Sequence, residues 1–141
     1  LTPGFSGRDI SGTGATAGRP DRLANGNLPV SQRQVTRWFD PSAFTIPPAN
    51  SGRFGDCGVN VLEGPGLNAQ HFSVTKRFYQ LNDHTNLEFQ FNILNLFNHP
   101  NFNLPAANIS ALSTVAQVQS TRPRLESAAG RTTSARLRIN F

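Results

Sequence analysis

Three stretches of this chain alternate apolar and polar residues, and this pattern limits the possible folds more than any other feature of the sequence. They are residues 71–81, 86–97 and 132–141. Successive side chains of a β-strand point to opposite faces, so each stretch is predicted to be a strand with one apolar and one polar face.

The second stretch also allows a helical interpretation, because helical spacing from Leu87 would pair Phe91 with Leu94. The period of two through Ile93 and the content of Phe and Ile favour a strand. Only the short polar turn around residues 82–85 separates it from the stretch before it. The first two stretches therefore predict a β-hairpin.

The length of these strands and of their connections points to a membrane β-barrel. Each strand is about ten residues long, close to the roughly 9–11 that cross a bilayer at a tilt. A short turn follows the first strand, whereas the second and third are separated by more than thirty residues. Outer-membrane barrels alternate short periplasmic turns with long external loops. The chain is predicted to be all-β, with antiparallel strands from a transmembrane β-barrel, and the third strand then ends at the periplasmic rim.

The rest of the chain is rich in turn residues. Residues 1–70 contain many Gly and Pro residues, which favour turns, and are predicted to be a long external loop region. Residues 98–131 are predicted to be a second long external loop within a terminal region that spans 71–141. Within that loop, Ile109–Val118 could form a short helix or a strand extension. Leu1 is not a methionine, and we expect the chain to be a fragment of a longer protein.

In a barrel, the two faces of these strands would meet different surroundings. The predicted lumen-facing side chains are Glu88, Gln90, Asn92, Arg136 and Arg138. The predicted lipid-facing side chains are Phe72, Val74, Phe89, Phe91, Leu137 and Ile139.

Two charged residues raise specific expectations within this pattern. Glu88 is expected to face an arginine across a strand pair. Lys76 interrupts the apolar face. It either snorkels to headgroups near the periplasmic end of its strand or turns inward at a local bulge.

The sequence offers no catalytic or cofactor site. The histidines, His71, His84 and His99, have no ligand spacing, and no carboxylate pair suggests acid–base chemistry. Cys57 is the sole cysteine, and we interpret it as incidental. The net charge of +5 comes from arginines dispersed along the chain, which does not favour nucleic-acid binding. We expect neither enzymatic activity nor a cofactor.

Several motifs occur in a familiar order: RWFDPSAF, FGDCGVNVLEGPGLN, FSVTKRF and FNILNLFNHPNF, then a terminal alternating strand that ends in Phe. This order resembles the C-terminal barrel portion of TonB-dependent outer-membrane receptors. The likeness is to the Oar-like subgroup, whose members carry a carboxypeptidase-regulatory-like domain.

The resemblance implies transport of a scarce solute across the bacterial outer membrane. It implies as partners the membrane lipid, the rest of the barrel with its plug, and an energy-coupling TonB complex. It also implies that Leu137, Ile139 and Phe141 form a terminal signal that the barrel-assembly machinery reads. The alternative is a secreted soluble β-sandwich or carbohydrate-binding module, which would need further strands to bury the same apolar faces.

Overall fold

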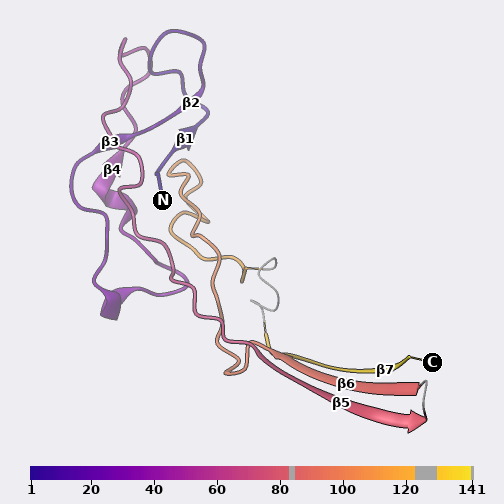
Figure 1. Ribbon diagram of the computed structural model, residues 1–141. Helices are drawn as coiled ribbons and strands as arrows, with labels where there is room; N and C mark the ends of the chain where they lie inside the picture. The colour runs from indigo at the N-terminus through magenta and orange to yellow at the C-terminus, as the bar shows by residue number, and fades with distance from the viewer. Residues whose placement is uncertain (83–84, 123–129, 141) are drawn as a thin grey trace. The chain divides into compact units, whose positions relative to one another are not determined.

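The computed structural model describes residues 1–82, 85–122 and 130–140 (Figure 1). Contacts divide the chain into two compact units. The loop unit comprises Leu1–Pro65 and Asn103–Ser120, and the strand unit comprises Gly66–Phe102 and Thr121–Phe141. All strands pair in antiparallel sheets, which confirms the predicted fold class. Across the described ranges, no helix is long and apolar enough to span a membrane.

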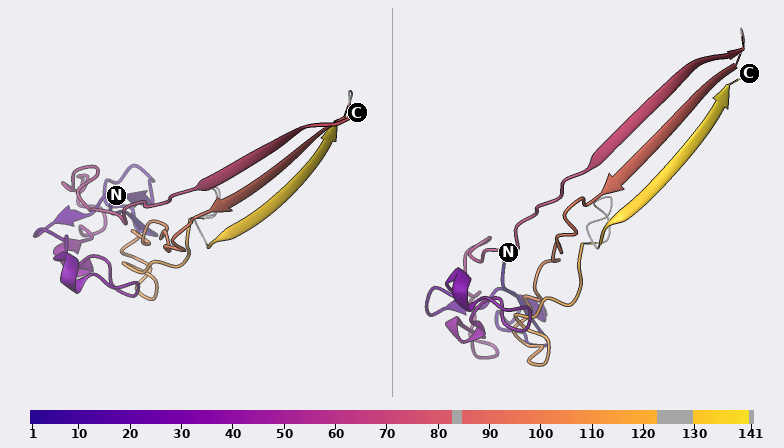
Figure 2. Two further views of the ribbon diagram at one scale, coloured as in Figure 1. Left: turned by 60° about the horizontal axis from the view of Figure 1, so that its bottom comes forward. Right: turned by 90° about the horizontal axis from the view of Figure 1, so that it is seen from below.

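The strand unit is built on one sheet of three long strands. These are β5 (Phe72–Asn82), β6 (Thr85–Leu94) and β7 (Thr132–Asn140). Their order is β5-β6-β7, so β6 lies in the middle, and the three strands run side by side along their length (Figure 2). The predicted hairpin of the first two stretches is present, and the third stretch pairs with the second.

The second strand ends earlier than the predicted range of 86–97. β6 stops at Leu94, and a turn follows in which the Asn98 amide donates to the Asn95 carbonyl at 2.8 Å. Asn95 has a φ of 54° and Asn98 a φ of 52°, values that asparagine tolerates better than most residues. The two asparagines therefore end the strand where the alternation blurs, and the last three residues of the predicted strand are wrong.

Strand pairing sets which side chains share a face. β6 pairs with β7 without interruption from Asn86↔Asn140 to Leu94↔Thr132. β5 pairs with β6 in regular register from Phe72↔Ile93 to Phe78↔Leu87, and a register shift follows before Asn82. Directly paired residues lie on the same face of a sheet, so the alternation of all three strands produces one continuous polar face and one continuous apolar face.

The loop unit contains only short elements. Strand β1 (Phe5–Ser6) pairs with β2 (Ala17–Gly18), and β3 (Asp21–Arg22) pairs with β4 (Phe44–Thr45). Two 3₁₀ turns complete it, η1 (Val30–Gln32) and η2 (Pro41–Ala43). Asp40 caps η2, because its side chain accepts a hydrogen bond from the Ser42 amide.

A small hydrophobic core holds the loop unit together. Phe39 is 1% exposed and packs edge-to-face on Phe44, with 6.3 Å between the ring centroids. The other core side chains come from distant parts of the sequence: Phe5, Ile10, Ala43, Cys57, Leu62, Ile109 and Ala116. Burial of these side chains lets a stretch dominated by turns adopt one conformation.

The segment 109–118 forms turns, so both alternatives for it, a short helix and a strand extension, are wrong. Backbone bonds from around this segment tie it to the N-terminal part of the loop unit. The Ile109 amide donates to the Gly4 carbonyl at 2.8 Å, and the Trp38 amide donates to the Ala116 carbonyl at 2.8 Å. Ala116 has a φ of 65°, which neither a helix nor a strand accommodates. Long-range pairing therefore overrides the local pattern.

The apolar face of the long sheet stays open. Its six predicted lipid-facing side chains include Val74 and Leu137, which are 44% and 61% exposed. A β-sandwich would bury this face under a second sheet. The exposure of these side chains counts against the soluble sandwich.

Candidate functional site

The polar face of the β5–β6–β7 sheet carries side chains in cross-strand rows. One row is Ser73–Asn92–Ser134, the next is Thr75–Gln90–Arg136, and the third is Arg77–Glu88–Arg138. These rows contain all five residues predicted to face a lumen. The structure thus brings them together on one face, while their assignment to a lumen remains a prediction.

Hydrogen bonds organise the neutral end of the polar face. The Ser73 hydroxyl donates to Asn92 Oδ1 at 2.6 Å, and Gln90 Nε2 donates to the same oxygen at 3.2 Å. These residues come from two strands and two successive rows. These contacts fix the orientation of the Asn92 side-chain amide. They also add side-chain hydrogen bonds to the backbone pairing of β5 and β6.

A charged row lies two rows further along the polar face. Arg77 donates through Nε to Glu88 Oε2 at 2.6 Å, so Glu88 forms its ion pair with β5. Arg138 lies opposite Glu88 in the register of β7. The expectation that Glu88 faces an arginine is confirmed on both sides. Only Arg77 forms an ion pair with it among residues 1–82, 85–122 and 130–140.

The apolar face carries all six predicted lipid-facing side chains. Its rows are Phe72–Ile93–Thr133, Val74–Phe91–Ala135, Lys76–Phe89–Leu137 and Phe78–Leu87–Ile139. Each row holds one phenylalanine, and most of the other side chains are aliphatic, which suits a half-buried or lipid-covered sheet surface. The lipid assignment itself remains a prediction.

Lys76 lies within this apolar face. It pairs directly with Phe89 in a regular part of the register, so the alternative of a bulge that turns it inward is wrong. It is the fifth of the eleven residues of β5, near the middle of the strand rather than at its periplasmic end. Its ammonium lies 5.8 Å from the centroid of the Phe78 ring. A ring face at this distance offers a weak cation–π contact.

The proposed terminal signal is described only in part. Leu137 and Ile139 are 61% and 55% exposed on the apolar face of β7. Phe141 lies outside the described residues, as does His84. The assembly role of the three residues therefore remains a prediction.

An asparagine clasp, formed by Asn68, Asn95 and Asn101, explains the FNILNLFNHPNF motif. Asn95 is 1% exposed and binds His99 twice, through Nδ2 to the His99 carbonyl and through Oδ1 to the His99 amide, each at 2.9 Å. Asn101 is fully buried and binds both the amide and the carbonyl of Asn68, at 2.7 and 3.0 Å. The side-chain amides therefore replace strand pairing where the sheet ends.

The two described histidines serve this same clasp. His71 Nδ1 accepts a hydrogen bond from the Asn95 amide at 3.1 Å, and His99 contributes its backbone. Over the described ranges, no group of three or more His, Cys, Asp or Glu side chains could hold a metal ion. The clasp gives His71 and His99 a structural role.

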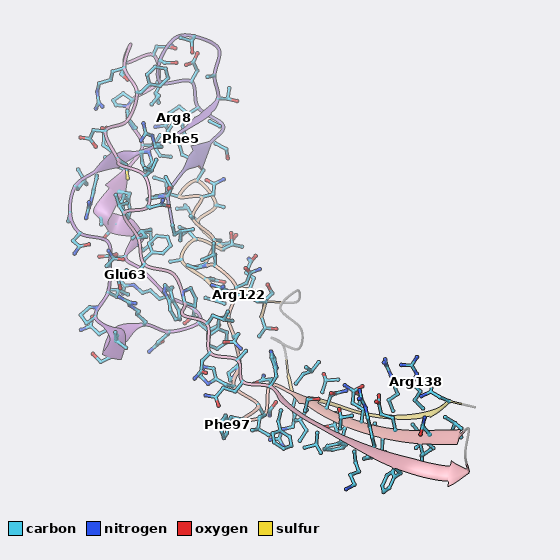
Figure 3. All side chains as sticks on the ribbon, in the orientation of Figure 1. Phe5, Arg8, Glu63, Phe97, Arg122 and Arg138 are labelled. Carbon is cyan, nitrogen blue, oxygen red and sulfur yellow. The ribbon has the colours of Figure 1, made fainter. Side chains whose placement is uncertain are left out.

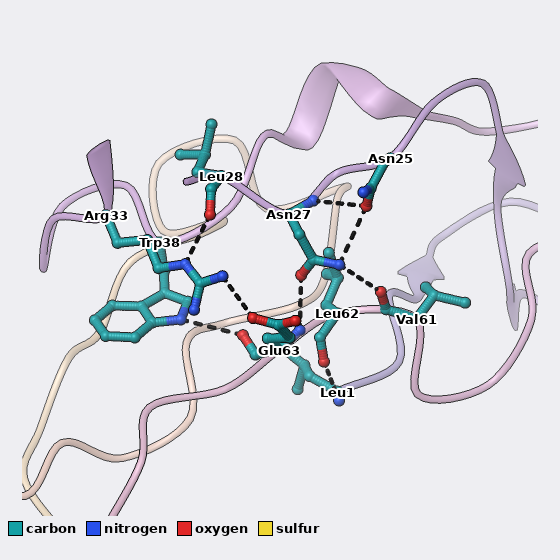
Figure 4. Close-up of polar contacts among 9 residues, drawn as sticks. All are labelled: Leu1, Asn25, Asn27, Leu28, Arg33, Trp38, Val61, Leu62 and Glu63. Atoms are coloured by element: carbon teal, nitrogen blue, oxygen red, sulfur yellow. Dashed lines mark hydrogen bonds and ion pairs between the residues drawn. The ribbon is translucent and has the colours of Figure 1, made fainter. Parts of the chain in front are cut away.

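A second polar network lies in the loop unit (Figure 4). Arg33 bonds to Glu63 Oε2 at 2.6 Å, and Trp38 donates through Nε1 to the Glu63 carbonyl at 3.1 Å. Asn27 accepts from the Glu63 amide at 2.8 Å and donates to the Val61 carbonyl at 2.9 Å. Sequence reasoning missed this network because its members lie 25 or more residues apart.

A clamp around Asp21 forms another charged contact of the loop unit. Arg53 binds both carboxylate oxygens of Asp21, at 2.7 and 2.6 Å. These hydrogen bonds lower the pKa of the Asp21 carboxyl. Gly55 lies against the same segment, since a Cβ there would overlap the Arg19 carbonyl oxygen. Cys57 is buried beside it, and burial raises the pKa of its thiol.

An antiparallel sheet whose bilayer-length strands have one apolar and one polar face defines a class, the β-barrel membrane proteins. Comparison with known families agrees, because a family model described as an outer membrane beta barrel domain matches residues 1–133. The match covers most of the 141 residues, so the chain belongs to this family and is located in the bacterial outer membrane. No curated protein and no solved structure matches the chain.

Proposed function

We propose that the chain is the C-terminal barrel segment of a TonB-dependent outer-membrane transporter that imports a scarce solute. The observation that carries the proposal is the two-faced sheet, in a chain whose motifs resemble that receptor group. An apolar face suits contact with lipid, and a polar face with guanidinium, hydroxyl and amide groups suits a wet lumen. The segment contributes wall and lumen surface and has no catalytic role.

The proposed partners follow from the position of the segment in such a protein. The apolar face contacts outer-membrane lipid, and the free edges of β5 and β7 pair with the rest of the barrel. The polar face lies toward the plug, and the barrel-assembly machinery reads the end of β7. The energy-coupling TonB complex acts through other parts of the protein. Nucleic acid is not among the partners.

A genetic experiment tests the transport function. The full-length protein is produced in its native host, and solutes depleted from the medium are compared with those depleted by a strain that lacks its gene. Energised import predicts a solute whose uptake needs both this gene and TonB. A solute that enters through the protein equally fast without TonB would show passive diffusion and contradict the proposal.

A further inference from the structure

The charges of the polar face gather in two adjacent rows. The row Ser73–Asn92–Ser134 holds only hydroxyl and amide groups, and the pair Asn86↔Asn140 at the other side is neutral as well. Arg77, Glu88, Arg136 and Arg138 all fall in the two rows between them. Hydration alone does not explain this division, since the neutral groups on either side already suit contact with water. These four residues define the arginine patch.

Glu88 does not neutralise the arginine patch. Its carboxylate is the single negative charge among three guanidinium groups, and Arg77 already binds it at 2.6 Å. The Glu88 side chain is 22% exposed, whereas that of Arg77 is 64% exposed. Glu88 is therefore held beneath the basic groups, and the patch keeps an excess of positive charge.

Arg136 and Arg138 supply that excess. They alternate on β7, so both lie on the polar face, about 7 Å apart along the strand. Both side chains are exposed, and that of Arg138 projects away from the sheet (Figure 3). Over residues 1–82, 85–122 and 130–140, neither guanidinium has a hydrogen bond or ion pair. Each presents five donors in a planar fork that fits the oxygens of a carboxylate or phosphate.

The surface around Arg138 is hollowed. Arg77, Glu88 and Arg138 line a groove of about 300 Å³ together with Asn86, Asn140 and the apolar Phe78 and Leu87. The asparagine amides add neutral donors and acceptors beside the guanidinium groups. A groove with these linings has room for a small oxyanion and groups to orient it.

We infer that the arginine patch binds an anionic group of the transported solute, a carboxylate or a phosphate. The inference rests on the proposed function, because it takes the polar face to line the transport path. Guanidinium groups at a water-filled wall raise the local concentration of anions and offer bidentate hydrogen bonds to them. The solute class is therefore an oxyanion-bearing molecule rather than a neutral or cationic one.

Calorimetric titration of the purified full-length protein at low salt tests the site. Inorganic phosphate and citrate are the probes, because they separate phosphate from carboxylate recognition, and maltose serves as a neutral comparison. The wild type is expected to bind at least one of the anions and not maltose. The double variant Arg136→Gln/Arg138→Gln is expected to bind that anion at least about tenfold more weakly.

A matched control removes the same two charges elsewhere. Arg8 and Arg131 are exposed and lie off the polar face. The variant Arg8→Gln/Arg131→Gln is expected to retain wild-type affinity, which separates the patch from a general effect of net charge. The variant Arg136→Lys/Arg138→Lys keeps the charge but loses the planar fork, so its affinity is expected to lie between those of the wild type and the glutamine variant. If the glutamine variant does not fold, the lysine variant still tests whether the two guanidinium groups bind the anion.

Three results would overturn the inference. The first is a wild type that binds neither anion, which would also be found if a carboxylate of the plug or barrel already occupies the patch. The second is equal affinity in the wild type and the Arg136/Arg138 variants. The third is a loss of anion affinity in Arg8→Gln/Arg131→Gln that equals the loss in Arg136→Gln/Arg138→Gln.

The uptake experiment keeps the two proposals apart. TonB-dependent import of a neutral solute, without anion binding, would overturn only this inference. Anion binding that depends on the patch, without TonB-dependent uptake, would overturn only the proposed transport function.

Discussion

Arg77 and Glu88 join β5 to β6 on the polar face, with 2.6 Å between Nε and Oε2. Arg77 is 64% exposed, so solvent screens the pair. A double-mutant cycle with Arg77→Gln and Glu88→Gln is expected to give a coupling free energy of about 0.2–1 kcal/mol. Urea unfolding of the full-length protein in bilayers measures it, and the coupling should shrink in high salt. A coupling that salt leaves unchanged would contradict an exposed pair.

Lys76 provides a test of the apolar face. If that face contacts lipid, a lysine near mid-strand destabilises the protein, by about 2–4 kcal/mol at the bilayer midplane. Lys76→Leu is then expected to stabilise the full-length protein against urea in lipid vesicles by an amount of that order. Thr75→Leu, on the polar face one residue away, is the control and should not stabilise. A neutral or destabilising Lys76→Leu would mean that lipid does not cover this part of the face.

Asn101 is the buried centre of the asparagine clasp. Asn101→Ala leaves the amide and carbonyl of Asn68 without their partners, at a cost of about 1–3 kcal/mol for an unsatisfied group. We expect the backbone amide of Asn68 to exchange its hydrogen faster in this variant, and mass spectrometry measures the exchange. Asn103→Ala is the matched control, because Asn103 is exposed and its side chain bonds only to the adjacent Leu104 amide and, at 3.3 Å, to Ser120 in the described residues. Equal exchange in both variants would remove the stabilising role of the clasp.

The clamp between Asp21 and Arg53 predicts a dependence on pH. Hydrogen bonds from Arg53 lower the pKa of Asp21 in the folded protein below 3.8. Its contribution to stability is therefore complete above the ordinary pKa and is lost as the pH falls through the lower folded pKa. Amide exchange of Asp56, whose N–H donates to Asp21, should accelerate in that acid range relative to the variant Asp21→Asn. A constant ratio of the two exchange rates would show that the carboxylate contributes nothing.

Phe141 provides a test of the assembly signal. Deletion of Phe141 from the full-length protein is expected to lower the amount of folded protein in the outer membrane, because the machinery is expected to read an aromatic end after Leu137 and Ile139. The heat-modifiable band of the outer-membrane fraction measures this amount. Phe141→Tyr keeps the aromatic ring and is expected to assemble normally. Normal assembly after the deletion would remove this role.

The long strands could be predicted because their information is local. Alternation placed Phe89 and Glu88 on opposite faces, and the short turn fixed β5 beside β6. The end of β6 was misplaced because Asn95 adopts a positive φ that no periodicity signals.

The loop unit was largely unpredictable for a different reason. The Arg33–Glu63 and Arg53–Asp21 contacts join residues 30 and 32 positions apart in segments without periodicity. Nothing in either segment indicates its partner. The arginine patch could be predicted only in part. Alternation placed Arg136 and Arg138 on one face. It could not show that Arg77 of β5 binds Glu88.

The order of the sheet also determines the sequence of events in folding. β5 and β6 pair up to Asn82↔Thr85, which are close neighbours in the sequence, so their hairpin closes with little loss of chain entropy. β7 begins only at Thr132 and pairs with β6 after the long segment that follows Leu94. Contacts between residues distant in sequence form slowly. We therefore expect β7 to be the last of the three strands to dock, after the β5–β6 hairpin has formed.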